Sequence, residues 1–498
     1  MRSKMKQWSE EIFAMSSLAF LKNAERSVAD KAWHSANDSA DSTVPKSRLG
    51  DYPGPRQGEL NVTPTKILIH GINYAPELIG VGRYTRDLAE YLATQGHSVE
   101  VITAPPHYPG WWVRPPYRSY AYAQEKLNGV TVRRCPLFLH RSGKGIWRLL
   151  IPLSFALAAT PVVVWRIIRS RPDVVLCIEP TLFSAPAAAL AAKIVGARRI
   201  LHVHDLEVDA AFAVGHLSGG LFKRMALSVE RIILHRFKRI VTISDRMRDR
   251  LLEKRQLADR VMVIRNWVDL SRIKLVTGPN SFRNEIGLSE SDFIVLYAGQ
   301  IGAKQSLHLV FEAAEQLAAV NGLHFVIAGD GPLKARFVDR YGNMPNVHFL
   351  PLQPEERLCE LLNIANLHIL PQDGAAADLV LPSKLGGMLA SRRPILIQAE
   401  EGTELYRLLK GVVKIVPPGD VGSLVGGIME AQTGDHDISG YEAAAAHFAR
   451  DQLLPRFLEI LTAERASGRA APLPTQDADY EGEALGLAFE PHQLIASK

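Results

Sequence analysis

"ILIHGINYAPELIGVGRYTRDLAEYLATQGHSVEVITAPP" occupies residues 67–106 and decides the fold class. Two short apolar runs enclose a stretch with helical periodicity, a pattern typical of a strand–helix–strand unit with parallel strands. The loop after the first run contains Gly80 and Gly82, which do not match the G-x-G-x-x-G motif of dinucleotide-binding proteins. These glycines either let a ligand approach the backbone or only allow a tight strand-to-helix connection.

The alternation of strands and helices continues along the chain. Further strands are predicted to begin near residues 98, 130, 173, 198, 239 and 260. After a polar link at residues 269–292, the pattern restarts with strands near residues 293, 324, 346, 367, 393 and 412. Apolar strands separated by helices indicate parallel sheets that are covered on both faces. The sequence therefore predicts two doubly wound α/β domains whose strand ends face each other across a ligand-binding cleft.

Length and composition agree with two soluble domains and exclude several protein classes. The chain has 498 residues, of which 47% are apolar and 22% charged. Its three cysteines, Cys135, Cys177 and Cys359, are far apart and have no metal-ligand spacing. We therefore expect reduced thiols in a cytoplasmic protein, without disulfides or a zinc site.

A basic block suggests where the protein works. Residues 126–172 contain nine Lys or Arg and no Asp or Glu. The uncharged run Leu149–Trp165 within it contains Pro152 and Pro161, and a spanning helix needs about 20 apolar residues. The run is either a helix buried against a sheet or an interfacial helix on an anionic membrane. The predicted membrane contacts are Arg148, Arg166 and Arg169. No motif for nucleic-acid binding accompanies the charge.

The two ends of the chain differ from its middle. Residues 1–64 form a predicted N-terminal extension, largely disordered, and residues 466–498 a disordered tail, because both are too polar to bury a core. Acidic residues before the apolar stretch near residue 13 argue against a signal peptide. The remaining boundaries are a first Rossmann-like domain at 65–268, a second at 269–440, and a C-terminal helix at 441–465 that returns to the first.

Two loops of the second domain predict a phosphate site. "AGQIGAKQ" (298–305) contains Gly299, Gly302 and Lys304, and "IAGDGPLK" (327–334) contains Gly329 and Gly331. Backbone amides at a helix N-terminus and a lysine ammonium suit a diphosphate. Each loop alone is also what a simple tight turn requires. Two such loops on successive strands favour the ligand site.

Several motifs together resemble the retaining GT-B glycosyltransferases of family 4, also called glycosyl transferases group 1. They are "NYAPELIGVGRY", "HVHDLEVDA", "TISDRM", "IRNWVD", "LYAGQIGAKQ", "IAGDGPL" and "LPSKLGGMLASRRPIL", spread over residues 65–465. The resemblance implies two Rossmann-like domains facing across a cleft. It also implies a nucleoside-diphosphate sugar held mainly by the second domain, an acceptor held mainly by the first, no cofactor and no obligatory metal.

The resemblance also assigns roles to residues. Lys304 matches a lysine directed at the donor phosphates, and His204 matches a cleft histidine beside Asp205 that positions hydroxyl groups; these three form the predicted catalytic set. His202 shares a face with His204 by the period of a strand and remains an alternative, as does a structural role for both. The predicted donor-binding residues are Gly80, Gly82, Gly299, Gln300, Gly302, Gly329, Gly331, Pro382, Ser383 and Lys384.

The chain departs from the family pattern at two places. Gln300 stands where relatives usually have an arginine, so Arg83 and Arg246 are alternative cations. Relatives also carry two glutamates eight positions apart, and the corresponding places here are Leu379 and Gly387. Asp378 is a candidate replacement for the missing carboxylate.

The expected function is a glycosyltransferase of bacterial exopolysaccharide assembly on the cytoplasmic face of the membrane. By resemblance, it transfers a sugar from a nucleoside diphosphate, with GDP-fucose as the expected donor, to a lipid-linked or growing glycan. The implied mechanism is front-face substitution with retention and without a protein nucleophile. Two alternatives stay open: a nucleotide-sugar epimerase of the same architecture, and a non-catalytic partner, which would explain Gln300 and the missing glutamates.

Overall fold

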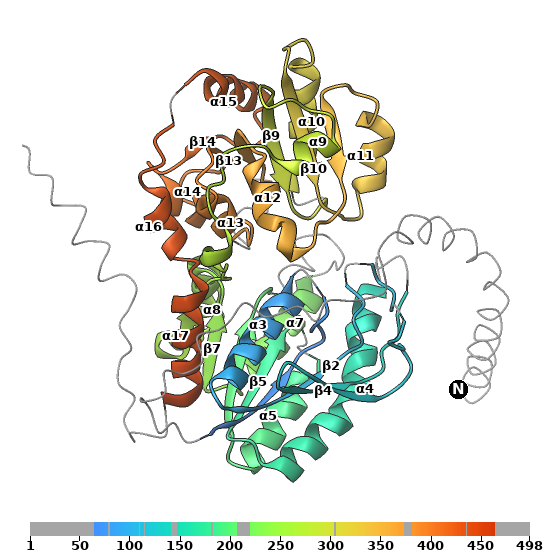
Figure 1. The fold of residues 1–498 in the computed structure, drawn as a ribbon. Coiled ribbons are helices and arrows are strands. Elements are labelled where there is room, and N and C mark those ends of the chain that lie inside the picture. Colours follow the sequence, from blue (N-terminus) through green and yellow to red (C-terminus); the bar gives the residue numbers. More distant parts are fainter. Residues whose placement is uncertain are drawn as a thin grey trace, which may run out of the picture. The chain divides into compact units, whose positions relative to one another are not determined.

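The computed structural model describes residues 64–77, 80–108, 110–113, 115–140, 147–180, 183–206, 220–302, 305–372, 381–434 and 436–463. The predicted extension up to residue 63 and the predicted tail from residue 466 lie outside these stretches. Figure 1 shows the helices and strands under the labels used below.

The first sheet has eight strands in the order β3-β4-β2-β1-β5-β6-β7-β8. Its pairs are parallel except for β3 with β4. The strands span β1 Lys66–His70, β2 Ser98–Thr103, β3 Ala123–Leu127, β4 Val130–Arg134, β5 Val174–Glu179, β6 Arg198–Val203, β7 Arg239–Thr242 and β8 Val261–Val263. All of them except β3 lie in apolar runs from which the sequence predicts a strand.

The β3–β4 hairpin is absent from the sequence prediction. Asn128 and Gly129 connect its strands, with φ angles of 46° and 84°. An Asn-Gly pair is the favoured sequence for such a two-residue turn, because both positions need positive φ. The residues of β3 are mostly exposed, so this strand has no apolar run that would reveal it.

Helices cover both faces of the first sheet. They span α3 Val81–Thr94, α4 Trp147–Ser170, α5 Ala185–Ile194, α7 Gly220–Leu234 and α8 Asp245–Glu253, with a 3₁₀ turn η2 at Ala258–Arg260. Successive side chains of a strand point to opposite faces. Leu68 of β1 therefore packs in one core with α4, α5 and α8. Ile67 and Ile69 pack in another with α3 and α17 (Arg450–Thr462).

The second sheet has six parallel strands in the order β11-β10-β9-β12-β13-β14. They span β9 Phe293–Ala298, β10 Leu323–Ala328, β11 Val347–Leu350, β12 Leu367–Leu370, β13 Ile395–Gln398 and β14 Lys414–Val416. All six lie in predicted runs. The two parallel sheets confirm the predicted fold class.

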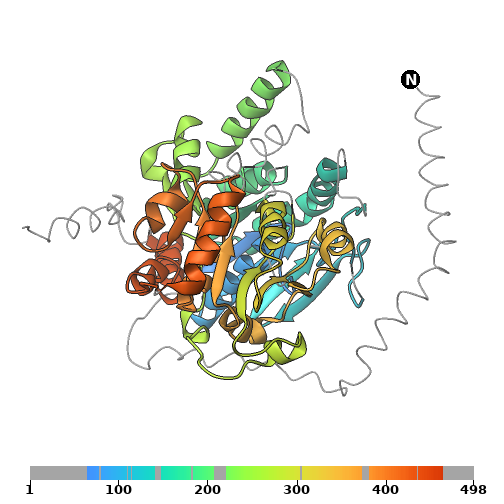
Figure 2. The same ribbon diagram turned by 90° about the horizontal axis from the view of Figure 1, so that it is seen from above.

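Helices also cover both faces of the second sheet, and both views show them flanking its strands (Figures 1 and 2). One core packs α10, α11 and α15 against Tyr297 and Phe325; a second packs α9 and α12 against Leu296 and Val326. The elements span η3 Leu270–Arg272, α9 Ser281–Glu285, α10 Leu307–Gln316, α11 Lys334–Tyr341, η5 Glu355–Arg357, α12 Leu358–Asn363, α13 Leu385–Ala390, α14 Glu404–Leu409, α15 Val421–Thr433 and α16 Tyr441–Ala446.

The segment 441–465 divides between the two sheets. Helix α16 packs with α13 and α14 in a core of the second sheet, where Tyr441 is buried. Helix α17 packs in the core of the first sheet, where Phe457 is completely buried. The chain crosses between them beside Val268, whose backbone hydrogen-bonds with Phe448 and Arg450.

Candidate active site

A cavity of about 280 Å³ lies at the carboxyl ends of β9 and β10. Ligands of doubly wound sheets bind at this edge. The second sheet contributes Ala298, Gly299, Gln300, Ala328, Gly329, Asp330, Leu352, Gln353, Pro354, Glu355, Leu358, Leu361, Leu362, Ser383, Lys384, Gly387 and Met388. The first sheet contributes Gly80, Arg83, Tyr84 and Tyr108, and Trp267 and Val268 complete the wall.

The cavity brings together part of the predicted donor-binding set. Gly80, Gly299, Gln300, Gly329, Ser383 and Lys384 line it, as does the alternative cation Arg83. Gly82, Gly302, Gly331 and Pro382 do not line it. Lys304, Asp378 and Leu379 lie outside the described residues, so the structure places none of the three.

Lys384 is the most unusual side chain of the cavity. The side chain as a whole is partly exposed, but its Nζ is buried and has no hydrogen-bond partner among the described residues. Nζ lies 3.7 Å from the centre of the Tyr297 ring, a cation–π contact. Burial lowers the pKa of Lys384 to about 7. A charged and a neutral form therefore both exist near neutral pH.

The turn after β9 faces that lysine. A β-carbon on Gly299 would lie 3.3 Å from Lys384 Nζ, so the glycine leaves the approach to the ammonium open. The hydroxyl of Tyr297 donates a hydrogen bond to the backbone oxygen of Gln300 at 2.6 Å, which fixes the turn. The side-chain amide of Gln300 donates to Tyr108 Oη at 3.2 Å. Gln300 therefore contributes a polar contact at the place where the resemblance leads us to expect a cation.

Packing against the protein itself explains three of the predicted glycines. A β-carbon on Gly329 would lie 1.9 Å from the Gly299 carbonyl oxygen, and one on Gly331 would lie 2.3 Å from that of Ile301. A β-carbon on Gly82 would lie 2.6 Å from a carboxylate oxygen of Glu77. The tight connections considered for these loops are thus present. Gly80 differs, because a β-carbon there would lie no closer than 3.5 Å to another atom, in this case of Tyr108. Gly80 lines the cavity at the N-terminus of α3 with φ of 68°.

Arg83 is held by a carboxylate in the cavity wall. Its Nη2 lies 3.4 Å from Glu355, and Arg86 and Arg272 each approach the same carboxylate to 3.3 Å. Burial alone would raise the pKa of Glu355, but the three guanidinium groups hold it below its ordinary value. Arg83 therefore shares its charge with a protein carboxylate.

The two predicted histidines lie in different surroundings although their ring centres are 4.0 Å apart. His204 stacks on Tyr84, which lines the cavity, at 6.1 Å. His202 contacts the ring of Phe457 at 5.0 Å, toward the core. Burial lowers the pKa of His204 to about 3. Burial and, to a smaller extent, the neighbouring His204 lower the pKa of His202 well below its ordinary value. Both imidazoles are neutral at physiological pH.

Tyr84 joins the two halves of the cavity. Its ring lies between His204 and Trp267, and a hydrogen bond links its side chain to Ser383. Burial raises the pKa of Tyr84, so the hydroxyl stays protonated. Sequence reasoning missed this residue, although it follows Arg83 directly in a quoted motif. It also missed Glu355, the first residue of η5, which follows β11. The rule that ligands bind beyond the carboxyl ends of strands could have indicated this residue.

The other predicted polar residues lie away from the cavity lining. Asp205 is partly exposed and does not line it. The backbone N–H of Arg246, in the first turn of α8, donates to Glu404 Oε2 at 2.9 Å. No group of three or more His, Cys, Asp or Glu suited to a metal ion occurs within the described stretches.

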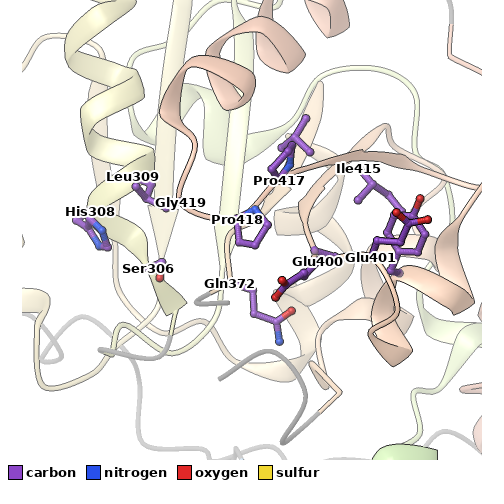
Figure 3. A pocket seen from close by; sticks show the side chains of 13 residues that line it. Ser306, His308, Leu309, Gln372, Glu400, Glu401, Ile415, Pro417, Pro418 and Gly419 are labelled. Atoms are coloured by element: carbon purple, nitrogen blue, oxygen red, sulfur yellow. The ribbon is translucent and has the colours of Figure 1, made fainter. Parts of the chain in front are cut away.

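A second cavity, of about 770 Å³, lies near the start of α10 and the ends of β13 and β14 (Figure 3). Its polar lining includes Ser306, His308, Gln372, Glu400 and Glu401. None of the predicted site residues lines it.

Of the predicted membrane contacts, Arg166 is occupied by a protein carboxylate. Its Nε and Nη2 donate to the two oxygens of Glu100 at 2.7 and 2.8 Å, so its charge is shared with that carboxylate. Glu100 lies outside the basic block, on β2. Arg169 is exposed, and the side chain of Arg148 is not among those described.

Helix α4 has two apolar faces. Ile151, Phe155, Ala159, Val163 and Ile167 are buried against the sheet. The opposite face exposes Leu153, Leu157, Pro161, Trp165 and Ile168. Leu150–Ser170 is the one described helix whose length and composition would suffice to cross a membrane, a weak indication by itself. The buried face agrees with a helix that packs on the sheet.

Sequence comparisons match a large part of each α/β domain to a known family. "Glycosyl transferase 4-like domain" matches residues 80–267, and "Glycosyl transferases group 1" matches residues 280–376. The colanic acid biosynthesis glycosyl transferase WcaI of Escherichia coli (strain K12) is 39% identical over 405 residues, which cover 79% of this chain and 98% of WcaI.

Solved structures share the fold at low sequence identity. HepE of Anabaena in complex with UDP-glucose has a TM-score of 0.58 and 15% identity, covering 80% of this chain and 100% of HepE. WaaG, a glycosyltransferase involved in lipopolysaccharide biosynthesis, has a TM-score of 0.54 and 16% identity, covering 80% of this chain and 99% of WaaG.

Proposed function

The chain belongs to the GT-B glycosyltransferases of family 4, and from this premise we propose that it transfers a sugar from a nucleoside diphosphate to a glycan of an exopolysaccharide. The observation that carries the proposal is the cavity between the glycine turn after β9 and the start of α3. The proposed donor is GDP-fucose, and the proposed acceptor is a lipid-linked or growing glycan. The relation to WcaI, a protein of colanic acid biosynthesis, supports the polysaccharide.

The proposed reaction proceeds with retention, by front-face substitution, without a protein nucleophile and without an obligatory metal. The carboxylates that line the cavity support this mechanism. Glu355 is held by three arginines, and Asp330 accepts a hydrogen bond from the backbone N–H of Gly331 at 2.7 Å. Both carboxylates are thus engaged by the protein. A departing diphosphate is then the base that takes the proton of the acceptor hydroxyl.

His204 has a proposed role in positioning. A neutral imidazole with a pKa of about 3 is a poor proton acceptor at physiological pH, but it can exchange hydrogen bonds with hydroxyl groups. Its stacking on Tyr84 holds it next to the cavity wall. Lys304 is the proposed second contact to the donor phosphates.

We further propose that the protein works on the cytoplasmic leaflet of an anionic membrane. The exposed face of α4 supports this, because a solvated helix face is normally polar. Leu157 and Trp165 expose 72% and 56% of their surface. Leu190 and Ile194 of the neighbouring α5 are also exposed, and Arg169 and Lys193 lie at the same ends of the two helices. An apolar face with flanking cations fits an interfacial contact.

The test is a donor panel assay with and without lipid extract. We expect the sugar of one nucleoside-diphosphate donor, GDP-fucose first, to be incorporated into lipid extract. Incorporation should persist when EDTA is present. Lys304→Ala should lower turnover about tenfold or more with an unchanged fold, because its charge stabilises the leaving diphosphate.

The same assay distinguishes the alternatives. An epimerase would convert the donor without extract, and a non-catalytic partner would leave every donor intact. Either result contradicts the proposed transfer. Loss of incorporation in EDTA would contradict the metal-independent reaction alone.

A further inference from the structure

The charged side chains of the cavity indicate which cation is available to bind an anionic donor. Apart from Lys384, the titratable and charged side chains that line the cavity are Arg83, Tyr84, Tyr108, Asp330 and Glu355. Beside them lie Tyr297 under the Lys384 ammonium, His204 against Tyr84, and Arg86 and Arg272 at Glu355. Arg83 is paired with Glu355, Asp330 bonds to the turn of Gly331, and burial raises the pKa values of Tyr84 and Tyr297, so both hydroxyl groups stay protonated. Among the described lining residues, Lys384 alone combines a cationic group with the absence of any hydrogen-bond partner.

The position of the ammonium also suits an anion. It lies against the ring of Tyr297 and beside Gly299, where the absence of a side chain leaves room. The neighbouring Ser383 lines the same wall. A buried ammonium without a carboxylate partner gains much from an incoming anion, because it has already lost its hydration.

We propose that Lys384 binds the diphosphate of the donor in place of the cation missing at Gln300, and that the bound diphosphate draws a proton onto the Lys384 amine. This inference rests on the proposed function. The amine nitrogen gains one proton from the buffer when the diphosphate enters and releases it when the diphosphate leaves. No other bond is made or broken in this step.

The empty site sets the direction of the pH dependence. Burial is the cause that lowers the pKa of Lys384 to about 7, and no charged neighbour contributes. Near neutral pH the empty site therefore holds a mixture of amine and ammonium. A diphosphate stabilises the ammonium and raises this pKa, so protons are taken up on binding. The affinity should therefore fall as the pH rises above 7.

A purely structural role for Lys384 predicts different behaviour. If the side chain only packs over Tyr297, its removal should weaken the binding of guanosine and of GDP to the same extent. If the side chain contacts the phosphates, its removal should weaken the binding of GDP and leave the binding of guanosine unchanged. The comparison of nucleoside with nucleoside diphosphate therefore separates the two roles.

The experiment is calorimetric titration of the full chain with guanosine and with the four anions GDP, UDP, ADP and inorganic pyrophosphate, in two buffers of different ionisation enthalpy. We expect the wild-type protein to take up a fraction of a proton with GDP near pH 7, and to bind GDP more weakly near pH 9. Lys384→Met should bind GDP about tenfold more weakly near pH 7, without proton uptake. Lys384→Arg should retain binding and lose the pH dependence, because arginine stays charged.

Lys410→Met is the matched control. Lys410 also lies over a tyrosine, with Nζ 5.6 Å from the Tyr406 ring, but it does not line this cavity. The control should bind GDP like the wild type. Proton uptake is measured on the wild-type protein, so the inference stays testable if Lys384→Met fails to fold.

Two results would overturn the inference. The first is GDP binding without proton uptake together with unchanged affinity in Lys384→Met; the proposed function survives this result. The second is the absence of binding of all four anions by the wild-type protein, which overturns the proposed function as well.

Discussion

At the scale of single residues, Lys384 shows how a buried charge connects stability with binding. A lysine whose pKa is lowered by burial destabilises the folded state whenever it is protonated. Binding of an anion repays that cost in the ligand complex. Sites with strongly shifted pKa values are often functional for this reason.

Lys384→Met should therefore stabilise the empty protein. The pKa of Lys384 is lowered to about 7 in the folded state, below the ordinary value of 10.5. The unfolded chain then binds more protons between these values, so wild-type stability should rise with pH in that window. We expect the variant to be more stable by about 2 to 4 kcal/mol near pH 6.5, and by little near pH 10. Urea denaturation at several pH values measures the difference.

The control for this prediction is Lys410→Met, which should change stability little at any pH. A gain for Lys384→Met that is equal at pH 6.5 and pH 10 would mean that packing, and not the buried charge, causes it.

His204 and His202 should respond differently to replacement by alanine. His204 stacks on a residue of the cavity wall, whereas His202 packs against Phe457. We expect His204→Ala to lower the transfer rate about tenfold, and His202→Ala mainly to lower the free energy of unfolding, by about 1 to 3 kcal/mol. Kinetics with the identified donor and thermal unfolding measure the two effects. Equal effects on transfer would remove the distinction between the two rings.

At the scale of elements, α4 shows why its sequence allowed two interpretations. Its apolar residues recur on two opposite faces, which a helix buried on one side only does not need. One face packs on the sheet and the other is exposed. Both readings of Leu149–Trp165, the buried helix and the interfacial one, therefore keep a physical basis.

The exposed face of α4 can be tested with vesicles. We expect the wild-type protein to sediment with anionic vesicles, to bind neutral ones less, and to be partly released by high salt. Leu157→Gln combined with Trp165→Gln should weaken this binding several-fold and leave donor hydrolysis unchanged. Leu257→Gln is the control, because it also replaces an exposed leucine, with 54% of its surface accessible. Leu257 directly precedes η2 and does not belong to α4.

Equal sedimentation with anionic and neutral vesicles, unchanged by the double substitution, would contradict a docking role for α4. The exposed stripe would then need another explanation, such as a protein partner.

At the scale of the whole molecule, α17 couples the end of the described chain to its beginning. Its residues Leu453, Phe457 and Leu461 share a core with Ile67 and Ile69 of β1. The first sheet therefore completes its core only after the second sheet has been synthesised. This makes the stability of the first sheet depend on a distant segment.

Phe457→Ala should destabilise the fold by about 3 to 5 kcal/mol, because Phe457 is completely buried and its removal leaves a cavity. The loss of stability should appear as a lower unfolding temperature, when thermal unfolding is monitored by protease cleavage within residues 65–268. An unchanged unfolding temperature would mean that α17 does not support the first sheet. Leu458→Ala is a matched control, since Leu458 is only partly buried on the same helix.

The sequence by itself determined the elements and the architecture. Continuous apolar runs predicted thirteen strands, because parallel strands covered on both faces must be apolar along their length. The glycine turns and the resemblance predicted a donor site at the ends of β9 and β10, where the structure has a cavity. The hairpin strand β3 escaped this reasoning because it lies at a sheet edge and is mostly exposed.

Only the tertiary structure decided which side chains meet. It brought Lys384 onto Tyr297, Glu355 between Arg83 and Arg272, and Glu100 onto Arg166. It also gave the two adjacent histidines different neighbours, Tyr84 for His204 and Phe457 for His202. Local periodicity reports whether a side chain faces a core or solvent, but strand order and crossover connections set its distant neighbours. The charge state of a buried group depends on those neighbours, which is why the role of Lys384 could be read only from the fold.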